Sequence, residues 1–197
     1  MNKKIFGFSP AYELRAASDG DKLALEGRAI VFEQPTVLYE IDGIQYKEVI
    51  DSHALDRTDL SDVVMRYNHA EGFTVLARTR NRSLELDKRP DGLYFRAELQ
   101  PEIQAHRDLF AAVKAGLIDK MSFGFRVADG GDEYDSMTHT RRIKNIARIY
   151  DISLVDFPAY EQTFVEARSR LEQFAGEDHK RKRLQVRTKI LKARLLI

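Results

Sequence analysis

The sequence predicts a mainly β fold with flanking helices (α+β), in which antiparallel strands close into a barrel. Between residues 22 and 158, short runs of apolar and β-branched residues recur, many of them alternating with polar residues as strands do. Turn signals such as Asp42-Gly43 and "KRPDG" separate these runs. Only one long segment has a clear helical pattern, so the strands are too rarely separated by helices for a parallel βαβ sheet.

The first hundred residues are expected to form strands joined by tight turns. A pair of alternating runs around Asp42-Gly43 predicts a hairpin, and Ser52 is placed to cap a short helix over residues 52–57. Pro35 interrupts regular structure after the first long strand. The expected strands span residues 12–17, 22–32, 36–50 (as the hairpin), 62–69, 74–87 and 92–100.

The clearest helix is expected over residues 101–116. Pro101 suits its first turn, Leu109 and Val113 lie on one apolar stripe, and Gly116 ends it. After this helix we expect the strand "MSFGFRV", a polar loop over residues 128–140 and a long strand-forming run over residues 141–157.

The charge distribution divides the chain into two parts. We expect a β-barrel domain over residues 1–160 and a basic helical tail over residues 161–197. Residues 177–197 contain eight Lys and Arg against two acids, whereas the rest of the chain has an excess of acids. The tail is interpreted either as a solvated helix end or as a segment that binds a partner.

Ser122 stands out within "MSFGFRV". The strand period of two places Met121 and Phe123 on one face and puts Ser122 and Gly124 on the other. A glycine inside a strand weakens it, so its presence indicates that another group, such as a substrate backbone, approaches closely. On the residues alone, Ser122 is interpreted as either a nucleophile or a structural serine beside a packing glycine.

A nucleophilic serine needs a base, and His69 is the best of the five histidines. It follows a β-run in "VMRYNHAEG", and catalytic groups are common where a strand opens into a loop. The alternative is a histidine that ends a strand and faces solvent. Among the others, His106 is expected to be exposed on the helix and His139 to lie in a polar loop.

Asp151 is the acid most in need of a partner. It lies in "RIYDISLVDF", where residues on both faces of the strand are apolar. Burying a carboxylate without a partner costs roughly several kcal/mol. A histidine would satisfy this carboxylate, and so would an arginine such as Arg142 or Arg148. Both pairings stay open at this point.

Several classes of function are excluded by missing motifs. The chain has no cysteine, which rules out disulfides, thiolate zinc sites and cysteine nucleophiles. It also has no Gly-rich phosphate loop, HExxH pair or G-x-S-x-G elbow. We therefore expect no metal and no cofactor. No apolar run is long enough to span a membrane, and no convincing signal peptide is present.

The order of several motifs resembles the prohead proteases of tailed phages of the HK97 type. The resemblance covers roughly residues 10–170 and rests mainly on "MSFGF" followed by "YDISLVDFPAY". It implies a serine endopeptidase whose closed β-barrel is distantly similar to that of the herpesvirus capsid-assembly protease.

By position, the resemblance implies that Ser122 is the nucleophile, His69 the general base and Asp151 the third member of the triad. The herpesvirus relatives use a second histidine in the third role, which makes His139 the competitor for that role.

The oxyanion donors are expected to be either backbone N–H groups or the side chains of Arg141 and Arg142. The family often has an acid directly after the histidine, where this chain has Ala70.

The resemblance also implies the substrates and the location. The expected substrates are the scaffold and the major capsid protein, cleaved inside the prohead in the host cytoplasm, together with the enzyme's own tail. Self-association in the prohead is expected, whereas nucleic acid and membrane are not expected partners. The alternative is a non-catalytic assembly component with the same fold.

Overall fold

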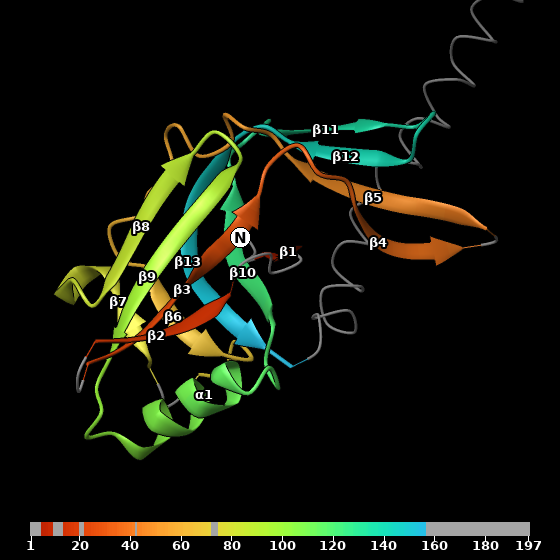
Figure 1. Ribbon diagram of the computed structural model, residues 1–197. Coiled ribbons are helices and arrows are strands. Elements are labelled where there is room, and N and C mark those ends of the chain that lie inside the picture. The colour runs from red at the N-terminus through yellow and green to blue at the C-terminus, as the bar shows by residue number, and fades with distance from the viewer. Residues whose placement is uncertain (1–4, 10–13, 20–21, 42, 72–74, 157–197) are drawn as a thin grey trace, which may run out of the picture.

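The computed structural model of the chain describes residues 5–9, 14–19, 22–41, 43–71 and 75–156 (Figure 1). The predicted basic tail over residues 161–197 lies outside the described residues, so the proposed division at residue 160 stays a prediction. The described part consists of three β-sheets, one α-helix and one short 3-10 helix.

Sheet A contains two of the residues singled out in the sequence, Ser122 and Asp151. Its strand order is β1-β10-β13-β6-β7. Strand β13 is central, antiparallel to β10 and parallel to β6. The strands span Ile5–Ser9 (β1), Lys120–Val127 (β10), Ile146–Val155 (β13), Val64–Tyr67 (β6) and Ala77–Arg78 (β7).

Sheet B is an antiparallel sheet with the order β2-β3-β9-β8, and in Figure 1 it lies in front of sheet A. Its register shifts once, between Arg28 and Ile30, where β3 meets β9. The strands span Arg15–Asp19 (β2), Lys22–Val31 (β3), Gly92–Leu99 (β9) and Leu84–Arg89 (β8).

Sheet C extends to one side of the molecule as two paired hairpins (Figure 1). Its order is β11-β12-β5-β4, and the predicted hairpin at Asp42-Gly43 forms β4 and β5, with Gly43 at φ 77° as its turn requires. The polar segment expected as a loop instead contributes β11. The strands span Asp132–Asp135 (β11), Thr140–Ile143 (β12), Ile44–Ile50 (β5) and Thr36–Ile41 (β4).

The predicted helix is present, but it begins three residues later than Pro101. Helix α1 spans Gln104–Lys114, and Gly116 at φ 71° follows its last turn.

Two other segments differ from the prediction. The 3-10 helix η1 spans Thr79–Asn81 and divides the run expected as one strand over residues 74–87. The short helix predicted over residues 52–57 is wrong: this segment forms turns, and the Asp51 carboxylate accepts from the His53 backbone N–H.

The hydrophobic core lies between sheets A and B and is covered at one end by α1. The predicted apolar face of β10 is confirmed, because Met121, Phe123 and Phe125 are all buried in it. They pack with residues of β3, β9, β13 and α1, among them Leu25, Ile30, Leu93, Phe95, Ile152, Leu154 and Phe110. This packing fixes which face of β10 turns away from the core.

The prediction of a closed antiparallel barrel is wrong for the residues that the structure describes. Each of the three sheets is open and ends in two edge strands. Two of the pairings, β12 with β5 and β13 with β6, are parallel. Alternating patterns identify the strands and their buried faces, but they do not specify which strands pair or in which direction. The mainly β class with one flanking α-helix is confirmed.

Candidate active site

Strand β10 holds Ser122 on the face opposite the core. Its neighbours Met121 and Phe123 point into the core, so the two-residue period turns Ser122 and Gly124 the other way, as the sequence predicts. This face is nevertheless covered, since Ser122 is 0% exposed. The apolar neighbours therefore fix the position of the hydroxyl.

Strand β13 brings two polar residues to the same face. In the antiparallel register with β10, Ser153 lies opposite Ser122, and Asp151 lies opposite Gly124. The register shifts directly beyond this point, where Tyr150 has no partner on β10. Such bulges re-aim neighbouring side chains. The residue that lies directly across the sheet from Gly124 is thus Asp151.

His69 lies in a tight turn after β6. Asn68 and His69 have φ angles of 50° and 54°, a left-handed conformation in which Asn and His are enriched among non-glycine residues. The turn is held by the Ala70 N–H donating to the Tyr67 carbonyl at 3.0 Å and by the Asn68 N–H donating to the Leu154 carbonyl at 2.8 Å. Because the second bond is to β13, the turn is fixed to the strand that carries Asp151.

These elements bring the three predicted residues together. His69 Nε2 lies 2.7 Å from Ser122 Oγ, and His69 Nδ1 lies 2.5 Å from Asp151 Oδ2. Both contacts are within hydrogen-bonding distance. The residues are 53 and 82 positions apart in the sequence, so only the tertiary fold makes this arrangement.

The arrangement can support nucleophilic chemistry. When Nδ1 carries the proton and donates to Asp151, Nε2 has a free lone pair that accepts the proton of Ser122 Oγ. The side chains of His69 and Asp151 are 11% and 2% exposed, so the contact between them is shielded from bulk water. Ser122 is fully buried, so neighbouring residues cover its hydroxyl in this conformation.

Ser153 belongs to the same cluster, although the sequence analysis missed it. It is 0% exposed, and its Oγ lies 3.0 Å from Asp151 Oδ2 and 3.2 Å from His69 Nδ1. The available signal was its spacing of two from Asp151, which puts both on one face of a strand.

The competing histidines lie elsewhere. His139 lies in the hairpin of sheet C, where its Nδ1 is 3.1 Å from the Tyr134 hydroxyl and its ring is close to Tyr46. His106 was expected to be exposed but is 3% exposed: its Nδ1 accepts from the Gln100 N–H, and its Nε2 lies 3.0 Å from the Val75 carbonyl. Burial holds the pKa of His106 below its usual value, and the bond to Val75 opposes this shift.

The two arginines suggested as oxyanion donors are engaged in sheet C. Arg141 is buried between Glu48, at 2.9 Å, and Asp132, at 2.6 Å. Burial raises the pKa of Glu48, and the charge and hydrogen bond of Arg141 oppose this. Arg142 pairs with Glu33 at 2.7 Å and with Asp51 at 3.2 Å. Both guanidinium groups are thus held by carboxylates.

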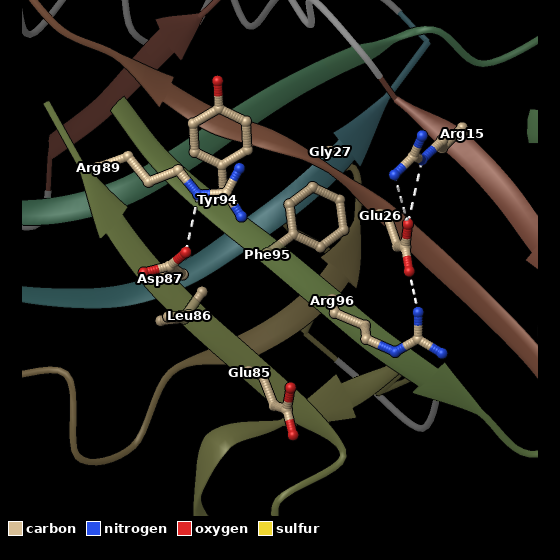
Figure 2. Close-up of a pocket in the computed structure, with 10 residues that line it drawn as sticks. All are labelled: Arg15, Glu26, Gly27, Glu85, Leu86, Asp87, Arg89, Tyr94, Phe95 and Arg96. Atoms are coloured by element: carbon tan, nitrogen blue, oxygen red, sulfur yellow. Dashed lines mark hydrogen bonds and ion pairs between the residues drawn. The ribbon is translucent and has the colours of Figure 1, made fainter. Parts of the chain in front are cut away.

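A separate groove lies on sheet B, and none of the three predicted residues lines it (Figure 2). Its charged side chains are largely paired with one another: Arg15 and Arg96 both contact Glu26, and Arg89 contacts Asp87.

Among the described residues, no group of three His, Asp or Glu lies close enough together to hold a metal ion. Over the same residues, no helix is long and apolar enough to cross a membrane.

Comparison with known proteins identifies relatives. The prohead protease of Enterobacteria phage HK97 is 32% identical over 155 residues, which cover 79% of this chain and 64% of that protein. The chain thus spans somewhat less than two thirds of the length of this relative. Among solved structures, the bacteriophage T4 capsid assembly protease matches with a TM-score of 0.48 and 12% identity, over 78% of this chain and 99% of that one.

A family model described as caudovirus prohead serine protease matches residues 10–177. The match includes Ser122, His69 and Asp151, and it extends over most of the chain. The chain therefore belongs to the caudovirus prohead serine protease family.

Proposed function

We propose that the chain is a serine endopeptidase in which Ser122 is the nucleophile, His69 the general base and Asp151 the residue that orients the imidazole. The observation that carries this proposal is the continuous contact from Ser122 Oγ through the imidazole to Asp151 Oδ2, at 2.7 Å and 2.5 Å. Membership of a serine protease family supports the same assignment.

The proposed reaction has two steps. Ser122 Oγ attacks the scissile carbonyl carbon while its proton moves to His69 Nε2, and the same proton then passes to the leaving amine as the C–N bond breaks. Water, deprotonated by His69, hydrolyses the resulting acyl-enzyme and restores the serine. Asp151 stays ionised and stabilises the imidazolium that forms in each step.

The oxyanion that forms in each step needs hydrogen-bond donors. Because Arg141 and Arg142 are each held in ion pairs with carboxylates, we assign this role to backbone N–H groups near Ser122. Backbone donors are already oriented before the reaction, which is what makes such stabilisation effective.

The proposed substrates are the scaffold and the major capsid protein of a tailed phage, cleaved inside the prohead in the host cytoplasm. The name of the HK97 relative, prohead protease, supports this assignment. We also propose that the enzyme associates with itself in the prohead and removes its own basic tail, over residues 161–197. The excess of cations in that segment suits an acidic shell interior or scaffold.

Co-expression with the major capsid protein of the same phage tests the proposal. The wild-type chain should convert the capsid protein to a shorter form of defined mass, and Ser122→Ala should leave it intact. Ser61→Ala is a matched control, since Ser61 is an exposed serine outside the site. If the capsid protein is shortened equally by Ser122→Ala and by the wild type, the nucleophile assignment is wrong. If neither protein shortens it, the chain is a non-catalytic assembly component.

Intact-mass analysis of the chain itself tests self-cleavage. Wild-type protein should lose a fragment that contains the basic tail, whereas Ser122→Ala should keep the mass of all 197 residues. Loss of the same fragment from both proteins would indicate a host protease instead.

A further inference from the structure

We propose that Ser153 is a positioning residue of the active site, whose hydroxyl holds the Asp151 carboxylate in the orientation that fixes His69. This inference deepens the proposed peptidase function and rests on it. Ser153 is fully buried, and it is joined to both Asp151 and His69.

The location of Ser153 follows from strand pairing. On β13 it is two residues from Asp151 and therefore on the same face, and on β10 its direct partner is Ser122. Its other neighbour in the sheet is Arg66 of β6, the strand that leads into the turn of His69. Ser153 thus lies at the centre of the cluster, between the strands that supply the nucleophile and the base.

Of the two side chains that contact the Ser153 hydroxyl, Asp151 is the one suited to accept its proton. Asp151 is an acceptor when ionised, and His69 Nδ1 must keep its own proton if Nε2 is to accept from Ser122. The Ser153 O–H therefore donates to Asp151 Oδ2, at 3.0 Å, and its oxygen lies 3.2 Å from the His69 Nδ1–H as a second acceptor. Oδ2 receives two donors at once, which restricts rotation of the carboxylate.

The functional consequence concerns the rate of the chemical step and not the binding of substrate. Without the hydroxyl, the carboxylate loses one of the donors that hold it, so the imidazole spends less time aligned with Ser122. Hydrogen bonds to charged groups are the stronger class, so we expect Ser153→Ala to slow the reaction about 10- to 100-fold. The half-saturation constant should stay unchanged.

A fluorophosphonate probe measures this effect without knowledge of the cleavage site. Ser122 Oγ attacks phosphorus, fluoride leaves, and intact mass reports the adduct. Ser153→Ala should lower the maximal labelling rate, and Ser153→Thr, which keeps the hydroxyl, should restore most of it. Ser61→Ala is the matched control, because the Ser61 hydroxyl also donates to an aspartate two residues away, Asp59, at 2.6 Å.

A second measurement needs no activity. In Ser122→Ala protein, the proton between His69 Nδ1 and Asp151 should give a far-downfield proton NMR signal. Addition of Ser153→Ala should shift or broaden that signal, and addition of Ser61→Ala should not. This readout would also decide the matter if Ser153→Thr fails to fold.

The outcomes separate the two proposals. If the wild type is not labelled, or Ser122→Ala is labelled equally fast, the peptidase proposal fails, while the NMR comparison still tests Ser153. If Ser122→Ala is inert but Ser153→Ala matches the wild type in both labelling and NMR signal, the positioning role is refuted. A lower labelling rate of Ser153→Ala with an unchanged NMR signal would also refute it.

Discussion

Gly124 lies directly opposite Asp151 on the neighbouring antiparallel strand, on the same face as Ser122. Side chains in such cross-strand pairs have Cβ atoms about 4.5–5.5 Å apart, so a side chain at residue 124 would lie beside that of Asp151. The absence of a side chain there leaves room for Asp151 to turn toward His69. A residue without functional groups therefore shapes the site as directly as the polar ones do.

Gly124→Val should consequently impair the site. The branched side chain would crowd Asp151 and move the imidazole away from Ser122, and a misplacement of about 1 Å can cost about 100-fold in rate. The fluorophosphonate labelling rate measures this loss. Arg126→Val is a suitable control, since Arg126 is on the same strand and face but two residues farther from Ser122. Equal labelling of both variants would contradict this account of Gly124.

Asp151→Asn should keep the fold and lose the activity. The amide is nearly the same size as the carboxylate, but it can donate to Nδ1 and so stabilise the wrong tautomer, in which Nε2 carries the proton. In an established Ser-His-Asp enzyme, the same change costs about 10⁴-fold in rate. We expect a loss of that order in capsid-protein cleavage, with an unchanged melting temperature. A variant that retains most of its rate would remove Asp151 from the triad.

The left-handed turn before His69 should restrict which residues are tolerated at position 68. At φ 50°, Asn68→Gly should be tolerated, whereas Asn68→Val should cost about 1–2 kcal/mol because a β-branched residue is strained in this region. The melting temperature and the fluorophosphonate labelling rate should therefore both be higher for Asn68→Gly than for Asn68→Val. If the two variants behave alike, the left-handed turn does not position His69.

The buried ion pairs of sheet C should matter for stability. Arg141→Met leaves Glu48 and Asp132 buried without their cation, which should lower the free energy of unfolding by about 3–5 kcal/mol. Urea denaturation measures this loss. Arg89→Met is the control, because its pair with Asp87 is exposed to solvent and should contribute much less to stability. Similar losses in the two variants would show that burial is not the cause.

His106 should make the fold sensitive to mild acid. Burial lowers its folded-state pKa below the ordinary value of 6.5, so the unfolded chain binds more protons between these two values. Its contribution to stability is therefore present above about pH 6.5 and is lost as the pH falls through the folded-state pKa. Thermal unfolding at about pH 7.5 and about pH 5.5 should show a larger drop for the wild type than for His106→Gln. The exposed His53 supplies the control variant, His53→Gln.

The sequence predicts the strands of this fold better than their assembly. Alternation around Ser122 correctly identifies the core face of β10, because burial of Met121 and Phe123 depends only on local period. Parallel pairing of β13 with β6 depends on contacts between segments more than 80 residues apart, which no local pattern encodes. The expected barrel failed for this reason, although the class of fold was correct.

The site was predictable to a similar degree. His69 and Asp151 are identified by their places at a strand end and in an apolar strand, and the resemblance to a known family then gives them roles. The role of Ser153 is not visible in this way, since a small residue in a buried strand is as often structural. The burial of His106 was also missed, because its partners Gln100 and Val75 lie outside the helix that carries it.

Strand β13 is the last described element in the chain, yet it lies in the middle of sheet A with β10 and β6 on either side. During translation, the segments that hold Ser122 and His69 leave the ribosome well before it. Until residues 146–155 insert between them, these two segments have no common sheet to hold them together. A nascent chain therefore cannot bring Ser122, His69 and Asp151 together until synthesis has passed this strand.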